Sequence, residues 1–275
     1  MLKIHLLITV IILLSFTTAI AHVKSDDASD TEFGIWWVND YSDNENCTNL
    51  NNADNEADAF SLKMVSEGYT RNFRLTNNDA QENHFSCSSV GGSDSNYADT
   101  CDFFYFAGHG SNNIMWFNED NDGDGVYPQK VQAIATSAYN EPEWGDTDLE
   151  WAFLHACSCL ASTWKAWWQD AFIGLHGICG ADTEMELYSD GRTGNWTAYY
   201  LTDGGQTIHE AWKQATKKTQ RTIYDCAIYR VKIKIDLFYY DYGDETIDDF
   251  LPDYGSGGVI KHSYLYTEWD CEYVP

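Results

Sequence analysis

Four short apolar runs, each bounded by glycine or polar residues, constrain the fold of this chain more than any other feature. They cover residues 33–38 (FGIWWV), 102–107 (DFFYFA), 149–156 (LEWAFLHA) and 175–180. Runs of this length that stay apolar at successive positions are typical of strands buried on both faces. Helical patterns lie between them. The sequence therefore predicts an α/β fold, with a mostly parallel sheet flanked by helices on both faces.

Other segments fill in this architecture. We expect helices over 53–67, 162–172 and 207–224, strands over 69–75 and 226–238, and a long polar loop over 76–100. The last fifty residues are rich in tyrosine and β-like, which indicates an antiparallel extension of the sheet or a small cap. The predicted organisation is one α/β domain over residues 32–225 and a C-terminal strand with a β-rich extension of the same domain over residues 226–275.

Residues 1–21 have the features of a secretion signal. Lys3 gives a basic start, residues 4–16 are almost continuously apolar, and residues 19–21 (AIA) form a small-residue cleavage site. An uncleaved membrane anchor is the alternative, because the apolar stretch is nearly long enough to span a bilayer. Polar sequence follows at once, which favours cleavage, and residues 22–31 are expected to be a disordered lead-in. We therefore expect a secreted protein with no membrane contact once the signal is removed.

The chain is strongly acidic. It has 43 Asp and Glu against 16 Lys and Arg, and a formal net charge of −27. Such a surface repels phosphate backbones and anionic lipids, which argues against nucleic-acid and membrane-surface partners. A saline habitat, where salt screens the self-repulsion, explains this charge better than a binding role does.

Eight cysteines in an exported chain suggest disulfide bonds, and four bridges would use all of them. A structural disulfide is therefore the alternative for every cysteine considered below. Asn46 and Asn195 each begin a short glycosylation sequon, Asn46-Cys47-Thr48 and Asn195-Trp196-Thr197.

The ends of two apolar runs carry residues suited to catalysis. His109 follows the run in FFYFAGHGS, and Cys157 follows the run in WAFLHACSC. Parallel strands bring their carboxyl ends to one edge of the sheet, so both residues should emerge there. A cysteine nucleophile needs a base or a cation to populate its thiolate, and an imidazole within reach supplies this. The backbone N–H groups of Gly110 and Cys157 could then form an oxyanion hole.

These two blocks resemble the signature of the caspase–legumain–gingipain group of cysteine peptidases, where an apolar block ends in His-Gly and a later one in Ala-Cys or a similar pair. The 48 residues from His109 to Cys157 are close to the caspase spacing of about 50. The resemblance covers residues 33–225, is specific only in the two blocks, and suits a secreted microbial branch of the group. It implies a caspase-like fold, Cys157 as nucleophile, His109 as general acid and base, and oxyanion donors at Gly110 and Cys157.

The chain departs from the caspases just after Cys157, where Ser158-Cys159 replaces the caspase segment. No arginine cluster for an aspartate pocket can be assigned, so the substrate preference stays open. The acidic surface favours substrates with a basic residue before the cut.

The other histidines fit less well. His176 follows the cysteine, which is the wrong order for this fold, and His155 should pack beside the site. A papain-like order would use His209 or His262, and neither has a supporting local motif.

The run Asp120-Asn121-Asp122-Gly123-Asp124-Gly125 matches the first half of a calcium loop, with carboxylates at positions 1, 3 and 5 and glycine at position 6. The twelfth position is Val131 rather than Glu, so the loop is not a complete EF-hand. A solvated acidic turn is the alternative. We expect a structural Ca²⁺ at Asp120, Asp122 and Asp124.

Taken together, these patterns predict a secreted cysteine endopeptidase that acts on protein or peptide substrates and needs no cofactor for its chemistry. The alternative is a catalytically silent exported binding or surface protein, which keeps the same scaffold and stabilises it with disulfides and calcium. The state of the Cys157 thiol distinguishes the two hypotheses.

Overall fold

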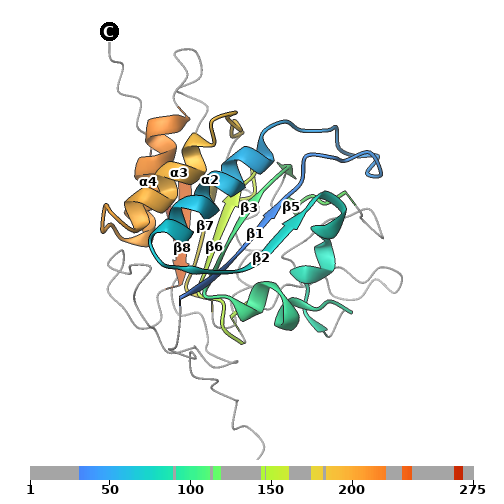
Figure 1. Cartoon of the computed structure of the whole chain (residues 1–275), viewed down its shortest axis with the longest axis horizontal. Coiled ribbons are helices and arrows are strands. Elements are labelled where there is room, and N and C mark those ends of the chain that lie inside the picture. The colour runs from blue at the N-terminus through green and yellow to red at the C-terminus, as the bar shows by residue number, and fades with distance from the viewer. Residues whose placement is uncertain are drawn as a thin grey trace, which may run out of the picture.

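A seven-stranded sheet forms the centre of the protein in the computed structural model (Figure 1). The structure describes residues 31–88, 91–111, 114–118, 144–145, 147–160, 175–181, 184–220, 231–236 and 263–268. The signal sequence, most of the lead-in, the acidic run at 120–125, the helix expected over 162–172 and most of the C-terminal extension lie outside these residues.

The strands lie in the order β2-β1-β3-β6-β7-β8-β9. Pairing is parallel from β2 to β7 and antiparallel from β7 through β8 to β9. The bounds are β1 Glu32–Trp37, β2 Thr70–Thr76, β3 Phe103–Ala107, β6 Trp151–His155, β7 Gly177–Ala181, β8 Val231–Asp236 and β9 Ser263–Glu268. The sheet is thus mostly parallel, and its last two strands form the antiparallel part expected at the C-terminus.

Three α-helices cover one face of the sheet (Figure 1). They are α2 Ala53–Ser66, α3 Arg192–Leu201 and α4 Ile208–Thr219. Their apolar sides pack onto alternate residues of the strands. Phe33 of β1 and Phe103 of β3 are register partners whose rings stack at 5.4 Å, and Phe60 of α2 meets them edge-on at 6.1 and 6.2 Å. Aromatic pairs of this kind contribute about 0.5–1.5 kcal/mol each beyond the area that they bury.

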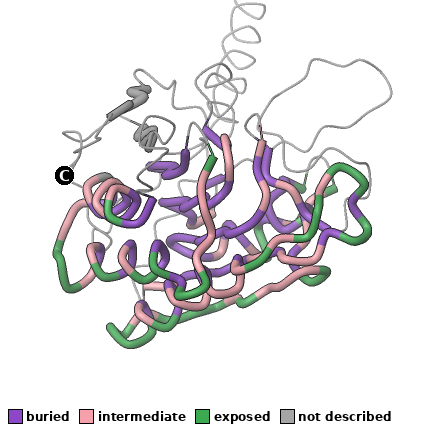
Figure 2. Tube along the Cα trace, turned by 90° about the horizontal axis from the view of Figure 1, so that it is seen from above, coloured by how far each residue is buried: buried purple, intermediate pink, exposed green. Residues whose placement is uncertain are grey.

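The opposite face is covered by irregular chain in the described residues. The loop expected after β2 contains the short 3-10 helices η1 Asn77–Asp79, η2 Glu82–His84, η4 Asp94–Asn96 and η5 Ala98–Thr100. Phe85 from this loop packs against Trp36 of β1 at 5.0 Å and Phe104 of β3 at 5.2 Å. All five residues of β3 and of β6 are buried as a result, and Figure 2 shows the buried residues gathered in the middle of the molecule.

Besides the 3-10 helices of that loop, the small hairpin of β4 Gly110–Ser111 and β5 Ile114–Met115 was not expected from the sequence, and neither was α3. Gly194 in α3 lets this helix approach α2, because a Cβ there would lie 2.0 Å from the carbonyl oxygen of Glu56. The strands expected at the four apolar runs and the helix expected at 53–67 are confirmed. No helix among the described residues is long and apolar enough to cross a membrane.

Candidate active site

The register between β3 and β6 brings the two expected catalytic residues to one edge of the sheet. Ala107, the last residue of β3, is paired with His155, the last residue of β6, in a parallel ladder. His109 and Cys157 each come two residues after this pair. They therefore leave the same edge of the sheet from neighbouring strands.

Two residues of the loop between β1 and α2 hold His109. The Nε2 atom of its ring lies 2.7 Å from the carbonyl oxygen of Thr48, and its backbone N–H donates to Oη of Tyr41 at 2.8 Å. The Tyr41 ring packs against the imidazole at 4.8 Å, and its hydroxyl donates to the carbonyl of Trp116 at 3.1 Å. Both the backbone and the ring of His109 are therefore fixed from one loop.

The contact with Thr48 decides the tautomer of His109. A carbonyl oxygen only accepts, so Nε2 carries the hydrogen and Nδ1 is left with its lone pair in the neutral ring. Burial lowers the pKa of His109, and the Thr48 carbonyl opposes this shift. The neutral ring is thus the favoured form near pH 7, with Nδ1 able to take a proton.

Cys157 is half-buried and its thiol is free. Its Sγ accepts the N–H of Met185 at 3.3 Å and donates to the carbonyl of Met185 at 3.6 Å. Burial raises the pKa of this thiol, the Met185 N–H lowers it, and the charge of Glu184 raises it. Within the part of the chain that the structure describes, His109 and Cys157 do not share a hydrogen bond. The raised pKa favours the protonated thiol, and the backbone of Met185 holds its sulfur.

Gly110 fits tightly between the two strand ends. A Cβ at this position would lie 2.6 Å from the carbonyl oxygen of Cys157, 2.6 Å from Sγ of Cys159 and 2.9 Å from Cβ of Ala156. Any larger residue would push the His109 and Cys157 segments apart. Ser158, next to the cysteine, has a φ of 53°, a left-handed conformation that is uncommon outside glycine. The chain thus turns sharply just after Cys157.

Comparison with known proteins identifies the family to which the chain belongs. The model of a family described as a domain of unknown function, DUF6345, matches residues 35–263. The chain belongs to this family. None of the curated proteins matches it.

The DUF6345 chain is also similar to a solved structure, that of a secreted C11 cysteine protease from Bacteroides thetaiotaomicron in complex with an irreversible peptide inhibitor. The identity is 13% and the TM-score 0.36, over 75% of this chain and 66% of that chain. The DUF6345 chain thus spans about two thirds of the length of that protease. A likeness at this distance carries no argument about activity.

The other histidines considered as candidates do not take part in the pair at the strand ends of the DUF6345 chain. His155, the last residue of β6, is fully buried beside the site, where its Nε2 lies 3.0 Å from the carbonyl oxygen of Glu186, and burial lowers its pKa to about 4. His176 is buried at the amino end of β7, at the opposite edge of the sheet. His209 lies on α4, and His262 is outside the described residues.

The alternative in which four disulfides use all eight cysteines is wrong. Cys101, Cys157 and Cys179 carry free thiols. Cys101 and Cys179 are buried, and Cys179 packs in the cluster beneath the helices. Cys179 thus occupies apolar surroundings, where a cysteine behaves as a small hydrophobic residue, whereas Cys101 lies near the carboxylates of Asp102 and Glu32.

The other expected sites of the DUF6345 chain divide into two groups. Asn46 and Asn195 are both exposed, as glycosylation requires, and Asn46 lies two residues before Thr48. The calcium ligands expected at Asp120, Asp122 and Asp124 lie outside the described residues.

Sequence reasoning missed the groups that hold the catalytic candidates. Tyr41 and Thr48 stand in a polar loop, and Met185 follows β7 in a segment with no periodic pattern. Thr48 and Met185 act through backbone atoms, which every residue type has, so no sequence signal could have identified them. Chemically, the arrangement combines a thiol, a neutral imidazole with an open nitrogen, and a third group that orients the imidazole.

Proposed function

We propose that this protein is a cysteine endopeptidase in which Cys157 is the nucleophile and His109 the general acid and base. The observation that carries the proposal is the register of β3 and β6, which brings an oriented, neutral imidazole and a free thiol to one edge of the sheet. Cys179, another free thiol among the described residues, is instead enclosed in the apolar cluster beneath the helices.

The first step follows from the state of the two side chains. The raised pKa of Cys157 keeps the thiol protonated near neutral pH, so a base is needed. Nδ1 of His109 takes the proton from Sγ, and the thiolate attacks the carbonyl carbon of the scissile peptide bond. The backbone N–H groups of Gly110 and Cys157 stabilise the negative charge on the carbonyl oxygen.

The second half returns the enzyme to its starting state. The tetrahedral intermediate collapses, the C–N bond breaks, and the protonated His109 gives its proton to the leaving amine. His109 then takes a proton from water, which attacks the thioester at its carbonyl carbon. Cleavage of the C–S bond releases a carboxylic acid, and the protonated His109 returns its proton to Sγ, which restores the Cys157 thiol. Thr48 holds Nε2 throughout, so the same nitrogen exchanges the proton in each step.

The charge of the site favours substrates with Lys or Arg before the cut. Glu184 is exposed, and its carboxylate is close enough to Cys157 to raise the pKa of the thiol. A cation beside the attacked carbonyl would offset this effect and gain from the overall net charge of −27. With the apolar stretch and small-residue site of residues 1–21, this gives a secreted enzyme acting on proteins or peptides.

A cleavage assay tests the proposal. Purified full-length protein is incubated with a peptide library, with and without Ca²⁺, beside the variants Cys157→Ala and Cys179→Ala. We expect cleavage by the wild type and by Cys179→Ala, which loses a buried thiol remote from the site, and none by Cys157→Ala. Absence of cleavage by the folded wild type, or cleavage by Cys157→Ala at the wild-type rate, would instead support the silent scaffold.

A further inference from the structure

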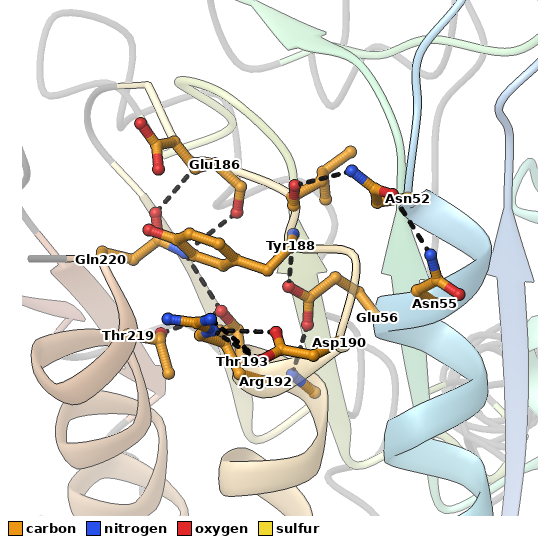
Figure 3. A network of polar contacts seen from close by, with 12 residues as sticks. Asn52, Asn55, Glu56, Glu186, Tyr188, Asp190, Arg192, Thr193, Thr219 and Gln220 are labelled. Carbon is orange, nitrogen blue, oxygen red and sulfur yellow. Dashed lines mark hydrogen bonds and ion pairs between the residues drawn. The ribbon is translucent and has the colours of Figure 1, made fainter. Parts of the chain in front are cut away.

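Gln220, the C-cap residue directly after α4, is bound to the backbone segment that holds Cys157 (Figure 3). Its Oε1 accepts the N–H of Glu186 at 2.8 Å, and its Nε2 donates to the carbonyl of Glu186 at 3.0 Å. Nε2 also lies 3.1 Å from Oγ1 of Thr193 at the start of α3. Gln220 is only 5% exposed, so water does not compete for these bonds. One side-chain amide thus holds both backbone polar groups of Glu186.

A single peptide group links Gln220 to Cys157. The peptide between Met185 and Glu186 is trans and planar, so its N–H and C=O point in opposite directions. The N–H end belongs to Glu186 and is held by Gln220, whereas the C=O end belongs to Met185 and accepts the Cys157 thiol at 3.6 Å. Fixing the direction of the N–H therefore also fixes the carbonyl that faces the sulfur.

His155 anchors the same segment from the sheet. Its Nε2 donates to the carbonyl of Glu186 at 3.0 Å, while its Nδ1 accepts the hydroxyl of Tyr105 at 2.9 Å. The Glu186 carbonyl thus receives two donors, one from β6 and one from the end of α4, and both of its lone pairs are used. The backbone beside Cys157 is held between the sheet and the helical layer.

We propose that Gln220 is a positioning residue that sets the reactivity of the Cys157 thiol by holding the backbone of Met185 against it. The inference rests on the proposed role of Cys157 as nucleophile. The protonated thiol donates to the Met185 carbonyl, and the thiolate accepts the Met185 N–H, so a fixed backbone serves both forms. A hydrogen-bond donor to the sulfur favours the charged form. Gln220 directly fixes the peptide that carries the Met185 carbonyl, and the Met185 N–H belongs to the preceding peptide on the same Cα. Without Gln220, both groups can move away from the sulfur. The thiol then loses only a weak bond from its S–H, whereas the thiolate loses a stronger, charge-assisted bond from the N–H, so the neutral thiol gains.

The test is the rate at which iodoacetamide alkylates Cys157 in the full-length protein, measured against pH and located by peptide mass mapping. Gln220→Met keeps the length of the side chain and removes both polar groups. We expect its alkylation midpoint at higher pH and a rate at pH 7 about tenfold lower than in the wild type, since a hydrogen bond to a charged group is lost. The readout needs no substrate. If the wild type cleaves no peptide but Gln220→Met still shows this shift, the proposed peptidase function is wrong and the positioning role of Gln220 stands.

The matched control is Gln214→Met on the same helix. The amide of Gln214 donates to Glu210 on α4 itself at 2.7 Å, so its loss should leave the alkylation profile unchanged. If Gln220→Met is unfolded in a melting curve, Gln220→Asn keeps the amide but is too short to reach both groups of Glu186, and the same shift is expected. An unchanged profile in a folded Gln220 variant, or an equal shift in Gln214→Met, overturns the inference. Loss of the fold in both Gln220 variants also overturns it, because Gln220 would then serve the fold alone.

Discussion

The Nε2 atom of His109 lies 2.7 Å from the carbonyl oxygen of Thr48, a residue 61 positions earlier in the chain. This contact fixes the ring as the tautomer whose Nδ1 is open. The same loop supplies Tyr41, which holds the backbone of His109. The loop between β1 and α2 therefore orients the imidazole, and the segment at Met185 orients the thiol. Two backbone carbonyls, from opposite sides of the site, orient the two reacting groups.

Tyr41→Phe tests the first of these supports. It removes the hydroxyl of the buried Tyr41, which accepts the His109 N–H and donates to the Trp116 carbonyl. Both of these backbone groups then lose a hydrogen-bond partner. We expect the free energy of unfolding to fall by about 1–3 kcal/mol, as for other buried polar groups left without a partner. Peptidase activity should also fall, several-fold more than the decrease in the folded fraction of the variant explains. Urea unfolding and a peptide cleavage assay measure the two effects.

Tyr97→Phe is the matched control for Tyr41→Phe. Its ring stacks on His84 at 3.9 Å, and its hydroxyl makes no hydrogen bond among the described residues. Stability and activity should both stay close to wild type. An equal loss of activity in the two variants would mean that Tyr41 acts only through the general packing of the loops.

Glu184→Gln tests the electrostatics of the nucleophile. Burial is the main cause of the raised pKa of Cys157, and the charge of Glu184 adds to it. Removing this charge should lower the pKa of the thiol and speed its alkylation at pH 7 roughly two- to fivefold. Cleavage after Lys or Arg should decline relative to cleavage after uncharged residues. The measurements are an alkylation profile against pH and the cleavage ratio for matched peptides.

Glu67→Gln is the control for Glu184→Gln, because it removes the same charge beyond the end of α2, where the chain turns into the amino end of β2. It should change neither the alkylation profile nor the cleavage ratio. If Glu67→Gln and Glu184→Gln change the ratio equally, the net charge of the protein, and not the carboxylate beside the site, selects the substrate.

The strand ends were predictable because of how the sheet is buried. Strands β3 and β6 are buried on both faces, so their sequences are apolar at successive positions and stand out from polar loops. Parallel pairing then requires His109 and Cys157 to share an edge. The prediction needed only the apolar runs and the position of each polar residue that follows them.

Helix α3 could not be predicted in the same way, because it depends on a distant side chain. Its sequence contains Gly194 and begins after Gly191, which has a left-handed φ of 60°. The two side-chain oxygens of Glu56 in α2 accept the N–H groups of Tyr188 and Gly194, at 2.9 and 2.8 Å (Figure 3). Glu56 lies 138 positions before Gly194, so no local pattern reveals that it caps this helix.

Glu56 also leads to a prediction about pH. Burial raises its pKa to about 7, although the N–H groups of Gly194 and Tyr188 oppose this shift. The folded protein therefore keeps the proton up to about pH 7, whereas the unfolded chain loses it near pH 4.5. The contribution of Glu56 to the free energy of unfolding is therefore fully present below pH 4.5 and is lost as the pH rises through 7. The total loss is about 3 kcal/mol.

Glu56→Gln isolates this contribution. Gln keeps one acceptor oxygen for the two N–H groups, so the variant should be less stable than the wild type at low pH. Because Gln does not titrate, the free energy of unfolding of the variant should not show the decline with rising pH that Glu56 causes in the wild type. The measurement is urea unfolding of both proteins between pH 4 and 8. The difference between the two curves should shrink as the pH rises. A difference that stays constant over this range would show that Glu56 does not titrate in it.

The final prediction concerns calcium, which we propose binds the acidic run at Asp120, Asp122 and Asp124. Three clustered carboxylates repel one another, and a bound Ca²⁺ replaces this repulsion with oxygen contacts. The run begins eleven residues after His109, so its order should also affect the segment that contains Gly110. We expect a chelator, or Asp122→Ala, to lower the melting temperature and the peptidase activity. A ligand at a hundred times its dissociation constant stabilises a protein by about 2.7 kcal/mol, which a melting curve detects.

The calcium experiment needs a control for charge alone. Asp79→Ala removes one carboxylate from an exposed position outside the run, and all melts are recorded at a fixed high ionic strength so that screening cannot imitate binding. Calcium should raise the melting temperature of the wild type and of Asp79→Ala by equal amounts, and that of Asp122→Ala by much less. If calcium leaves all three curves unchanged, residues 120–124 form a solvated acidic turn. In that case His109 and Gly110 must be held without a metal, by Tyr41, Thr48 and the close contact with Cys157.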